Sequence, residues 1–253
     1  MLPRIIRIRR YAWSIGPPGP PQLRFCRSIR CGGRSLQRRS RVVSAKILTP
    51  SLVQAPRQRQ YPLFLQPDQG IRLDTVMTVL RATYQGTVLA AKAQRPIGYE
   101  RTAESHIIVL DDRMPKELKG VIWQAVSTPL GSPYMPLFNT IDDIPDGYTQ
   151  GDNQYGPLSA YWSFRGLYSL AKSQGDTCLD EIVTLWKNYE RSCLREHVYI
   201  KAMLTALYRS DPNGAIEFTK RYSTGIAYQT VGLANGKRNE LMTKVATLEV
   251  EPL

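Results

Sequence analysis

Residues 105–126 read SHIIVLDDRMPKELKGVIWQAV, and this stretch decides the fold class. Its two ends, 105–110 and 121–126, are short runs rich in β-branched and other apolar residues, which is typical of strands. The charged segment between them is short, so the two strands are predicted to pair antiparallel. A further apolar run, YMPLF at 134–138, predicts a third strand after a break that contains glycine and proline.

The chain downstream of this sheet is predicted to be helical. Ser159 is placed to cap a first helix, and apolar residues at helical spacing predict a long second helix over 176–208. The Ser-Asp-Pro sequence at 210–212 predicts a stop and a restart, with the aspartate as cap and the proline at the first helical position. The last helix is expected to run toward Gly232, followed by an amphipathic piece around 241–248. Strands followed by helices indicate an α+β fold rather than a doubly wound parallel sheet.

The net charge of +13 comes from one segment of the chain. Residues 1–60 hold thirteen arginines, one lysine and no acidic residue, whereas residues 61–253 hold 20 basic and 21 acidic residues. We therefore expect no nucleic-acid interface on the globular part. We expect residues 1–60 to be disordered, because their composition buries too little apolar surface to offset the loss of chain entropy. The predicted domains are 1–60 and 61–253, and the second starts with a short helix that Asp74 can cap.

Three origins of residues 1–60 remain open. An arginine-rich, acid-poor composition is typical of a mitochondrial transit peptide. A basic arm that binds nucleic acid has a similar composition. The abrupt change of composition near residue 61 also fits a stretch translated out of frame ahead of a genuine coding segment. The expected location is the cytoplasm, or the mitochondrion if the segment is a presequence.

Cysteines and histidines give no metal signature. The four cysteines, at positions 26, 31, 178 and 193, form no CxxC pair, and the chain has two histidines. A structural zinc site needs four closely arranged ligands, so we expect neither a metal nor another cofactor. The chain contains no run of about 18 apolar residues, so no transmembrane helix and no membrane partner is predicted.

Three stretches, taken together and in this order, resemble one protein family. They are RPIGYERTAESH at 95–106, GVIWQAVSTPLGSPYMPLF at 120–138 and SAYWSFRGLYSLA at 159–171. The sequence resembles the dipeptidase A family of cysteine N-terminal-nucleophile hydrolases, which is related to the secernins and more distantly to penicillin V acylase. The resemblance covers residues 62–253, and it rests on the co-occurrence of the stretches because none is a catalytic motif by itself.

The resemblance implies a four-layer αββα sandwich, of which this chain supplies the C-terminal portion, and hydrolysis of dipeptides or other small peptides. In such enzymes the mature N-terminal residue is a cysteine, whose thiolate attacks the amide carbonyl while its own α-amino group acts as the base. An acyl-enzyme forms and water releases it, while backbone and amide donors hold the oxyanion. The resemblance implies no metal and no cofactor.

The nucleophile that the family uses is not evident in this chain. The sequence begins Met1, Leu2, Pro3, and no cysteine is followed by the opening strands of the family. Cys178 and Cys193 lie in the predicted helical region, where a thiol is more often a small buried hydrophobe than a nucleophile. We therefore expect the N-terminal nucleophile half to be missing and the chain to be inactive alone. The alternative is a non-catalytic binding or organelle-targeted protein derived from the family.

Arg101 is the candidate site residue. It lies in a stretch that resembles the Arg-Thr and Ser-His segment of the family, and the resemblance implies that a late arginine tunes the thiolate or binds a substrate carboxylate. A guanidinium suits both tasks, because it is permanently charged and can grip a carboxylate with two hydrogen bonds. Arg95 is the second choice, and a surface ion pair is the alternative for either residue. His106 is interpreted as a structural histidine, since an N-terminal nucleophile needs no histidine base.

Overall fold

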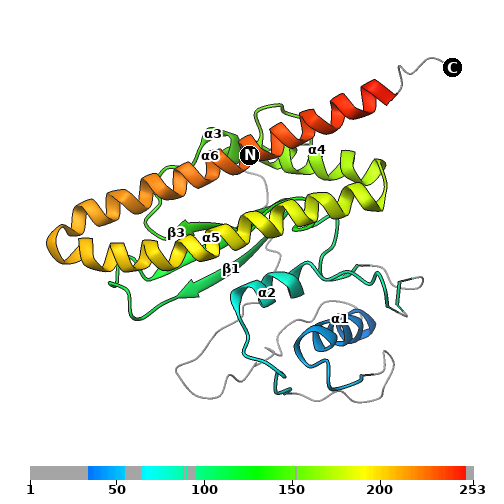
Figure 1. The fold of residues 1–253 in the computed structure, drawn as a ribbon, viewed down its shortest axis with the longest axis horizontal. Coiled ribbons are helices and arrows are strands. Elements are labelled where there is room, and N and C mark those ends of the chain that lie inside the picture. Colours follow the sequence, from blue (N-terminus) through cyan, green and yellow to red (C-terminus); the bar gives the residue numbers. More distant parts are fainter. Residues whose placement is uncertain (1–33, 55–63, 88, 91–94, 152, 249–253) are drawn as a thin grey trace, which may run out of the picture. The chain divides into compact units, whose positions relative to one another are not determined.

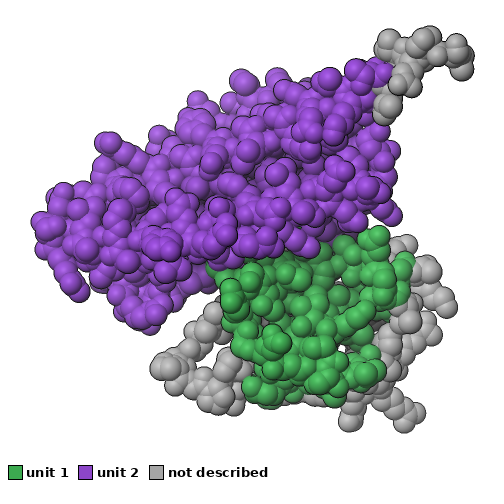
Figure 2. Space-filling model, in the orientation of Figure 1, with its two compact units in different colours: residues 1–97 green, residues 98–253 purple. Residues whose placement is uncertain are grey.

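A computed structural model of the 253-residue chain describes residues 34–54, 64–87, 89–90, 95–151 and 153–248. The chain divides into two units, Met1–Ile97 and Gly98–Leu253, which Figure 2 shows in green and purple. This boundary differs from the predicted one at residue 60. Within the described residues, no helix combines the length and the apolar content that crossing a membrane requires.

The sheet of the second unit forms as the sequence predicts. Its strands are β1 (Glu104–Leu110), β2 (Gly120–Val126) and β3 (Met135–Phe138). They lie in the order β1-β2-β3, and both neighbouring pairs are antiparallel. In this unit the helices follow the strands along the chain, so the predicted α+β class is confirmed (Figure 1).

The helical region begins and ends close to the predicted residues. Its helices are α3 (Asp146–Thr149), α4 (Ala160–Ser173), α5 (Asp176–Ser210) and α6 (Pro212–Leu248). The hydroxyl of Ser159 caps α4 by accepting the backbone N–H of Trp162 at 3.5 Å. The carboxylate of Asp211 accepts the N–H of Gly214 at 2.8 Å in the first turn of α6. Both predicted caps are confirmed.

Helix α6 continues beyond its predicted end at Gly232. The prediction of two separate helical pieces is wrong, because the inward face of α6 is unbroken. Ala227, Ala234 and Leu241 are all buried, and each lies two helical turns from the next. Burial of this face outweighs the weak helix propensity of glycine.

The helices cover one face of the sheet. Ile107 lies opposite Trp123, and Val121 lies opposite Phe138, so these four side chains point to the same side. His197 of α5 contacts both aromatic rings, and its ring centroid lies 5.7 Å from each of theirs. We call the side formed by Ile107, Val121, Trp123 and Phe138 the covered face.

The opposite side of the sheet also carries apolar residues. Ile108 and Leu110 of β1 are 54% and 65% exposed, and Ile122 of β2 lies opposite Ile108. We call the side formed by Ile108, Leu110 and Ile122 the open face. Apolar residues on both sides of a strand are typical of strands that are buried on both faces.

Side chains from the helices satisfy backbone donors along β3. The N–H of Phe138 donates to the hydroxyl of Ser223 on α6 at 3.0 Å. The N–H of Tyr134, just before β3, donates to the carboxylate of Glu190 on α5 at 2.6 Å. Ser223 and Glu190 are both buried, so these bonds replace partners that water cannot supply. Apolar packing and hydrogen bonds together fix the helices on the sheet.

The described part of the first unit contains two helices, α1 (Arg34–Leu48) and α2 (Leu73–Leu80). Val43 of α1 packs in a buried cluster with Tyr84 and Leu89. This tertiary contact shows that α1 has an apolar face, which its arginine-rich composition did not indicate.

The prediction of disorder over 1–60 is therefore wrong for the helix α1. The remainder of that segment, 1–33 and 55–60, lies outside the described residues. Helix α2 begins two residues earlier than predicted, with Arg72 at the cap, and Asp74 lies in its first turn.

Candidate functional site

Two of the stretches that carry the sequence resemblance are joined by hydrogen bonds in the second unit. The backbone N–H of Ser127, directly after β2, donates to the carbonyl of Ala103 at 2.7 Å. The hydroxyl of Thr128 donates to the carbonyl of Tyr99 at 3.3 Å. The chain before β1 and the chain after β2 are therefore held against each other.

Helix α4 brings the third stretch to the same place. The guanidinium of Arg165 donates to the carbonyl of Glu100 at 2.5 Å, and the ammonium of Lys172 binds the carboxylate of Glu100. We call the region formed by residues 98–105, residues 127–134 and this face of α4 the junction. All three stretches of the resemblance thus contribute to one region of the fold.

The ring of Tyr168 organises the α4 side of the junction. The cations of Arg165 and Lys172 lie 5.4 Å and 6.0 Å from the centroid of this ring, which is within cation–π range. A Cβ atom placed on Gly131 would lie 2.5 Å from the Cβ of Tyr168. Only glycine therefore allows the segment 127–134 to approach α4 this closely.

A chain of hydrogen bonds links the junction to the helix layer. The hydroxyls of Ser105 and Tyr134 lie 2.8 Å apart, and the backbone N–H of Tyr134 donates to Glu190 on α5. Tyr134 and Glu190 are both buried. Because a buried polar group is costly to leave unpaired, these bonds fix the end of the segment 127–134.

Ser127 stores backbone strain at the junction. Its φ angle is 70°, and a non-glycine residue in this region costs about 1–3 kcal/mol. The residue is fully buried, and its hydroxyl has no hydrogen-bond partner among the described residues. Strain and an unpaired polar group are frequent at functional sites. The sequence did not reveal this feature, because Val-Ser-Thr contains none of the residues that favour a positive φ.

The predicted candidate Arg101 lies at the junction. Its side chain is exposed, next to Glu100. The pKa of Glu100 is lowered chiefly by the hydrogen bond from Lys172, and the charges of Lys172, Arg165 and Arg101 add to this effect. The second choice, Arg95, belongs to the first unit, where its φ angle is 62° and its carbonyl accepts the hydroxyl of Tyr84 at 3.3 Å.

Sequence reasoning missed Arg165 and Lys172 as site residues. A signal was present, since Arg165, Tyr168 and Lys172 have the spacing of residues that share one helix face. The missing information was that Glu100, more than 60 residues earlier, would lie against this face.

Neither thiol in the described part of the chain is an activated nucleophile. Cys193 on α5 is buried, and burial raises the pKa of its thiol to about 11. Burial also raises the pKa of Cys178. A raised pKa leaves the thiol protonated at neutral pH, whereas the nucleophilic form is the thiolate. Cys26 and Cys31 lie outside the described residues.

The two histidines lie on strand β1 and on helix α5. Nδ1 of His106 lies 3.5 Å from the carboxylate of Glu104 on the same strand. His197 lies between Trp123 and Phe138 on the covered face, where burial lowers its pKa to about 4. In the part of the chain that the structure describes, no three His, Cys, Asp or Glu side chains are grouped as metal ligands.

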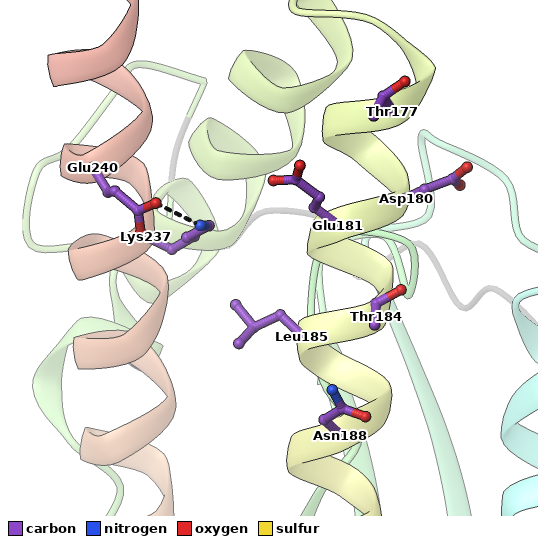
Figure 3. A pocket seen from close by; sticks show the side chains of 8 residues that line it. All are labelled: Thr177, Asp180, Glu181, Thr184, Leu185, Asn188, Lys237 and Glu240. Atoms are coloured by element: carbon purple, nitrogen blue, oxygen red, sulfur yellow. Dashed lines mark hydrogen bonds and ion pairs between the residues drawn. The ribbon is translucent and has the colours of Figure 1, made fainter.

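A shallow groove lies between α5 and α6 (Figure 3). Glu181 and Leu185 point toward α6, where Lys237 donates to Glu240 at 2.8 Å, whereas Asp180 points away from α6. The complete lining consists of Thr177, Asp180, Glu181, Thr184, Leu185, Asn188, Lys237 and Glu240. None of these residues comes from the three stretches, so the junction is the better candidate site.

Comparison with known proteins assigns the family. Residues 36–188 match the family model described as Peptidase family C69. The chain belongs to peptidase family C69. The match includes the whole junction, and it begins inside the acid-free segment instead of near residue 62. The residues of α1 from 36 onward are therefore part of the family sequence.

Several curated relatives of this C69 chain carry dipeptidase names. The chain is 25% identical over 212 residues to the probable dipeptidase B of Streptococcus pyogenes serotype M1, a match that covers 76% of the chain and 43% of the relative. It is 24% identical over 206 residues to a probable dipeptidase A of Streptococcus pyogenes serotype M3 (strain SSI-1), again covering 76% and 43%. It is 26% identical over 145 residues to the probable dipeptidase B of Lactococcus lactis subsp. lactis (strain IL1403), covering 53% and 30%. The chain thus spans less than half the length of these relatives.

Proposed function

We propose that this chain is the C-terminal part of a dipeptidase that uses an N-terminal cysteine as its nucleophile. Dipeptides or other small peptides are the substrates. The observation that carries the proposal is the junction, because three stretches of a peptidase-family sequence that are distant along the chain contribute to one region of the fold.

The chemistry of such an enzyme is covalent catalysis. The α-amino group of the N-terminal cysteine takes the proton of the thiol, and the thiolate attacks the carbonyl carbon of the peptide bond. The tetrahedral intermediate collapses, the C–N bond breaks, and the amine leaves with that proton. Water then hydrolyses the thioester and releases the acid. Hydrogen-bond donors that face the oxyanion lower the barrier of both steps.

Arg101 serves this reaction with its permanent positive charge. A guanidinium beside the nucleophile favours the thiolate over the thiol, and it can also hold a substrate carboxylate. The exposure of Arg101 and its position at the junction support this assignment.

The sheet of the second unit is one of the two sheets of an αββα sandwich. Helices α5 and α6 form the outer layer on its covered face. The second sheet stacks on the open face, where it removes Ile108 and Leu110 from water. The apolar residues on both sides of β1 support this arrangement, because a sheet with one solvated face usually alternates apolar and polar residues.

We expect the chain by itself not to hydrolyse dipeptides through the thiols of its described residues. The thiols of Cys178 and Cys193 are held in their protonated form by burial, and the mechanism requires a cysteine with a free α-amino group. The alternative function is that of a non-catalytic binding or organelle-targeted protein derived from the family. The basic composition of residues 1–33 favours this alternative.

Measurements on the native protein distinguish these two functions. It is captured from its own source with an antibody against residues 159–253, and its intact mass, its N-terminal residue and its dipeptidase activity are measured. A species heavier than 28.7 kDa that begins with cysteine and loses activity on alkylation supports the dipeptidase. A species of 28.7 kDa or less without dipeptidase activity contradicts it and supports the alternative.

A further inference from the structure

Three cationic residues lie at or next to Glu100 in the junction, and one of them, Lys172, binds its carboxylate. Arg165 and Lys172 both hydrogen-bond Glu100, one to its carbonyl and the other to its carboxylate. Arg101 follows Glu100 directly, and its charge acts on the same carboxylate. With three positive charges and one negative charge, this cluster carries a net charge of +2.

Most of the donors of these cations are available to a ligand. The described hydrogen bonds use one N–H of Arg165 and one N–H of Lys172. A guanidinium has five donors and an ammonium has three, so each retains several. The side chain of Lys172 is 53% exposed, which leaves its remaining donors accessible from solvent.

The fold holds the cations in place before any ligand arrives. The ring of Tyr168 lies against both Arg165 and Lys172, and Tyr168 itself is buried against Gly131. Cations that are already positioned lose less side-chain entropy when they bind an anion. A preorganised set of donors with excess positive charge is the arrangement that recognises a carboxylate.

We infer that Arg101, Arg165 and Lys172 form the site that binds the free C-terminal carboxylate of a dipeptide, with Glu100 as the residue that positions Lys172. The inference rests on the proposed function, and it identifies the C-terminal carboxylate as the substrate group that side chains of α4 bind. A dipeptide has its terminal carboxylate one residue beyond the scissile bond, whereas an internal bond of a longer peptide does not. A carboxylate site at this place therefore selects dipeptides.

Binding of alanyl-alanine and of its C-terminal amide to the full 253-residue chain tests the inference. The titration is followed by NMR through the arginine side-chain N–H signals, and no turnover is needed. Alanyl-alanine is expected to shift the signals of Arg101 and Arg165, and to bind about tenfold more tightly than the amide, which lacks one charge-assisted contact. The preference should weaken as salt is added, because these groups are near the surface.

Three variants identify the residues responsible. Arg101→Gln and Lys172→Gln should each weaken binding of alanyl-alanine about tenfold and leave binding of the amide unchanged, because each removes one charge-assisted contact. Glu100→Gln should instead tighten binding of alanyl-alanine, because the amide oxygen can still accept from Lys172 and keep it in place, while the competing negative charge is removed. An increase in affinity cannot result from a damaged fold. The matched control is Arg221→Gln, whose side chain is 80% exposed on α6 and which should change neither affinity.

Two results overturn the inference. One is that both peptides bind with equal affinity, or that neither binds. The other is that the variants at positions 100, 101 and 172 behave like the control. Either result leaves the proposed dipeptidase function standing if the heavier native species cleaves dipeptides. The converse result is that the chain binds the carboxylate selectively but the native protein cleaves no dipeptide. That result contradicts the proposed function and still supports the carboxylate site.

Discussion

Both faces of the β1-β2-β3 sheet carry apolar residues, and the two faces differ in exposure most clearly at β1. On the covered face Trp123 and Phe138 are fully buried beneath α5 and α6. On the open face Ile108 and Leu110, from the neighbouring strand β1, remain more than half exposed, although Ile107 of β1 on the covered face is buried. An apolar sequence therefore makes a face of the sheet suitable for burial. Whether that face is buried depends on a partner element that covers it. Stability should therefore depend strongly on one face and weakly on the other.

The largest expected effect is at the centre of the covered face. Trp123→Ala removes a fully buried ring that packs on His197, so the free energy of unfolding should fall by about 3–5 kcal/mol. Urea denaturation followed by circular dichroism measures this loss. Ile108→Ala, on the neighbouring strand but on the open face, is the matched control and should cost much less. Equal losses for the two variants would contradict the distinction between the faces.

Acid should weaken the covered face through His197. Burial lowers the pKa of this residue to about 4, with a further lowering by Lys201 that Asp111 partly opposes. The unfolded chain has the ordinary histidine pKa of about 6.5 and therefore binds a proton more readily than the folded chain. The contribution of neutral His197 to the free energy of unfolding is fully present above pH 6.5. It is lost as the pH falls from about 6.5 to about 4, and the loss is up to about 3 kcal/mol.

Denaturation midpoints measured across this pH range check the histidine effect. His197→Phe keeps an aromatic ring between Trp123 and Phe138 and removes the titrating group. The variant should flatten the decline between pH 6.5 and 4, in the range set by the two pKa values. A decline that persists unchanged in the variant would assign it to other groups.

A smaller effect is expected where a helix side chain completes the edge of the sheet. Glu190→Ala leaves the buried N–H of Tyr134 without its acceptor, so the free energy of unfolding should fall by about 1–3 kcal/mol. Glu190→Gln retains a carbonyl oxygen at the same place and should recover most of this loss. Thermal unfolding of the two variants side by side gives the comparison, and equal losses would show that charge matters more than the hydrogen bond.

The sheet and most helix ends were predictable because their signals are local. Alternating and β-branched runs indicated β1, β2 and β3, and the residues Ser159 and Asp211 marked the starts of α4 and α6. The errors arose where distant contacts decide. Val43 gives α1 an apolar contact that its composition hides, and the buried Ala234 and Leu241 carry α6 past its glycines.

The candidate site was predictable only in part for the same reason. Arg101 was predicted from the stretch that contains it, and its role stays a prediction. Arg165 and Lys172 become site residues only because α4 packs against Glu100, and the strained backbone of Ser127 depends on its attachment to Ala103. Such contacts between residues that are distant in sequence are not encoded in any single motif.

The smallest expected effect in this chain is also the one that tests the sandwich. Leu110→Asn on the open face and Val198→Asn on α5 replace apolar side chains of equal exposure, 65% in each case. In the 253-residue chain both should change the free energy of unfolding by less than about 0.5 kcal/mol, because neither side chain is removed from water. In a longer native species that carries a second sheet, Leu110→Asn should become destabilising by about 1–3 kcal/mol, since it places an amide in an apolar interface. Val198→Asn should remain neutral there. If Leu110→Asn is as neutral as Val198→Asn in the longer species, no second sheet covers this face and the sandwich is wrong.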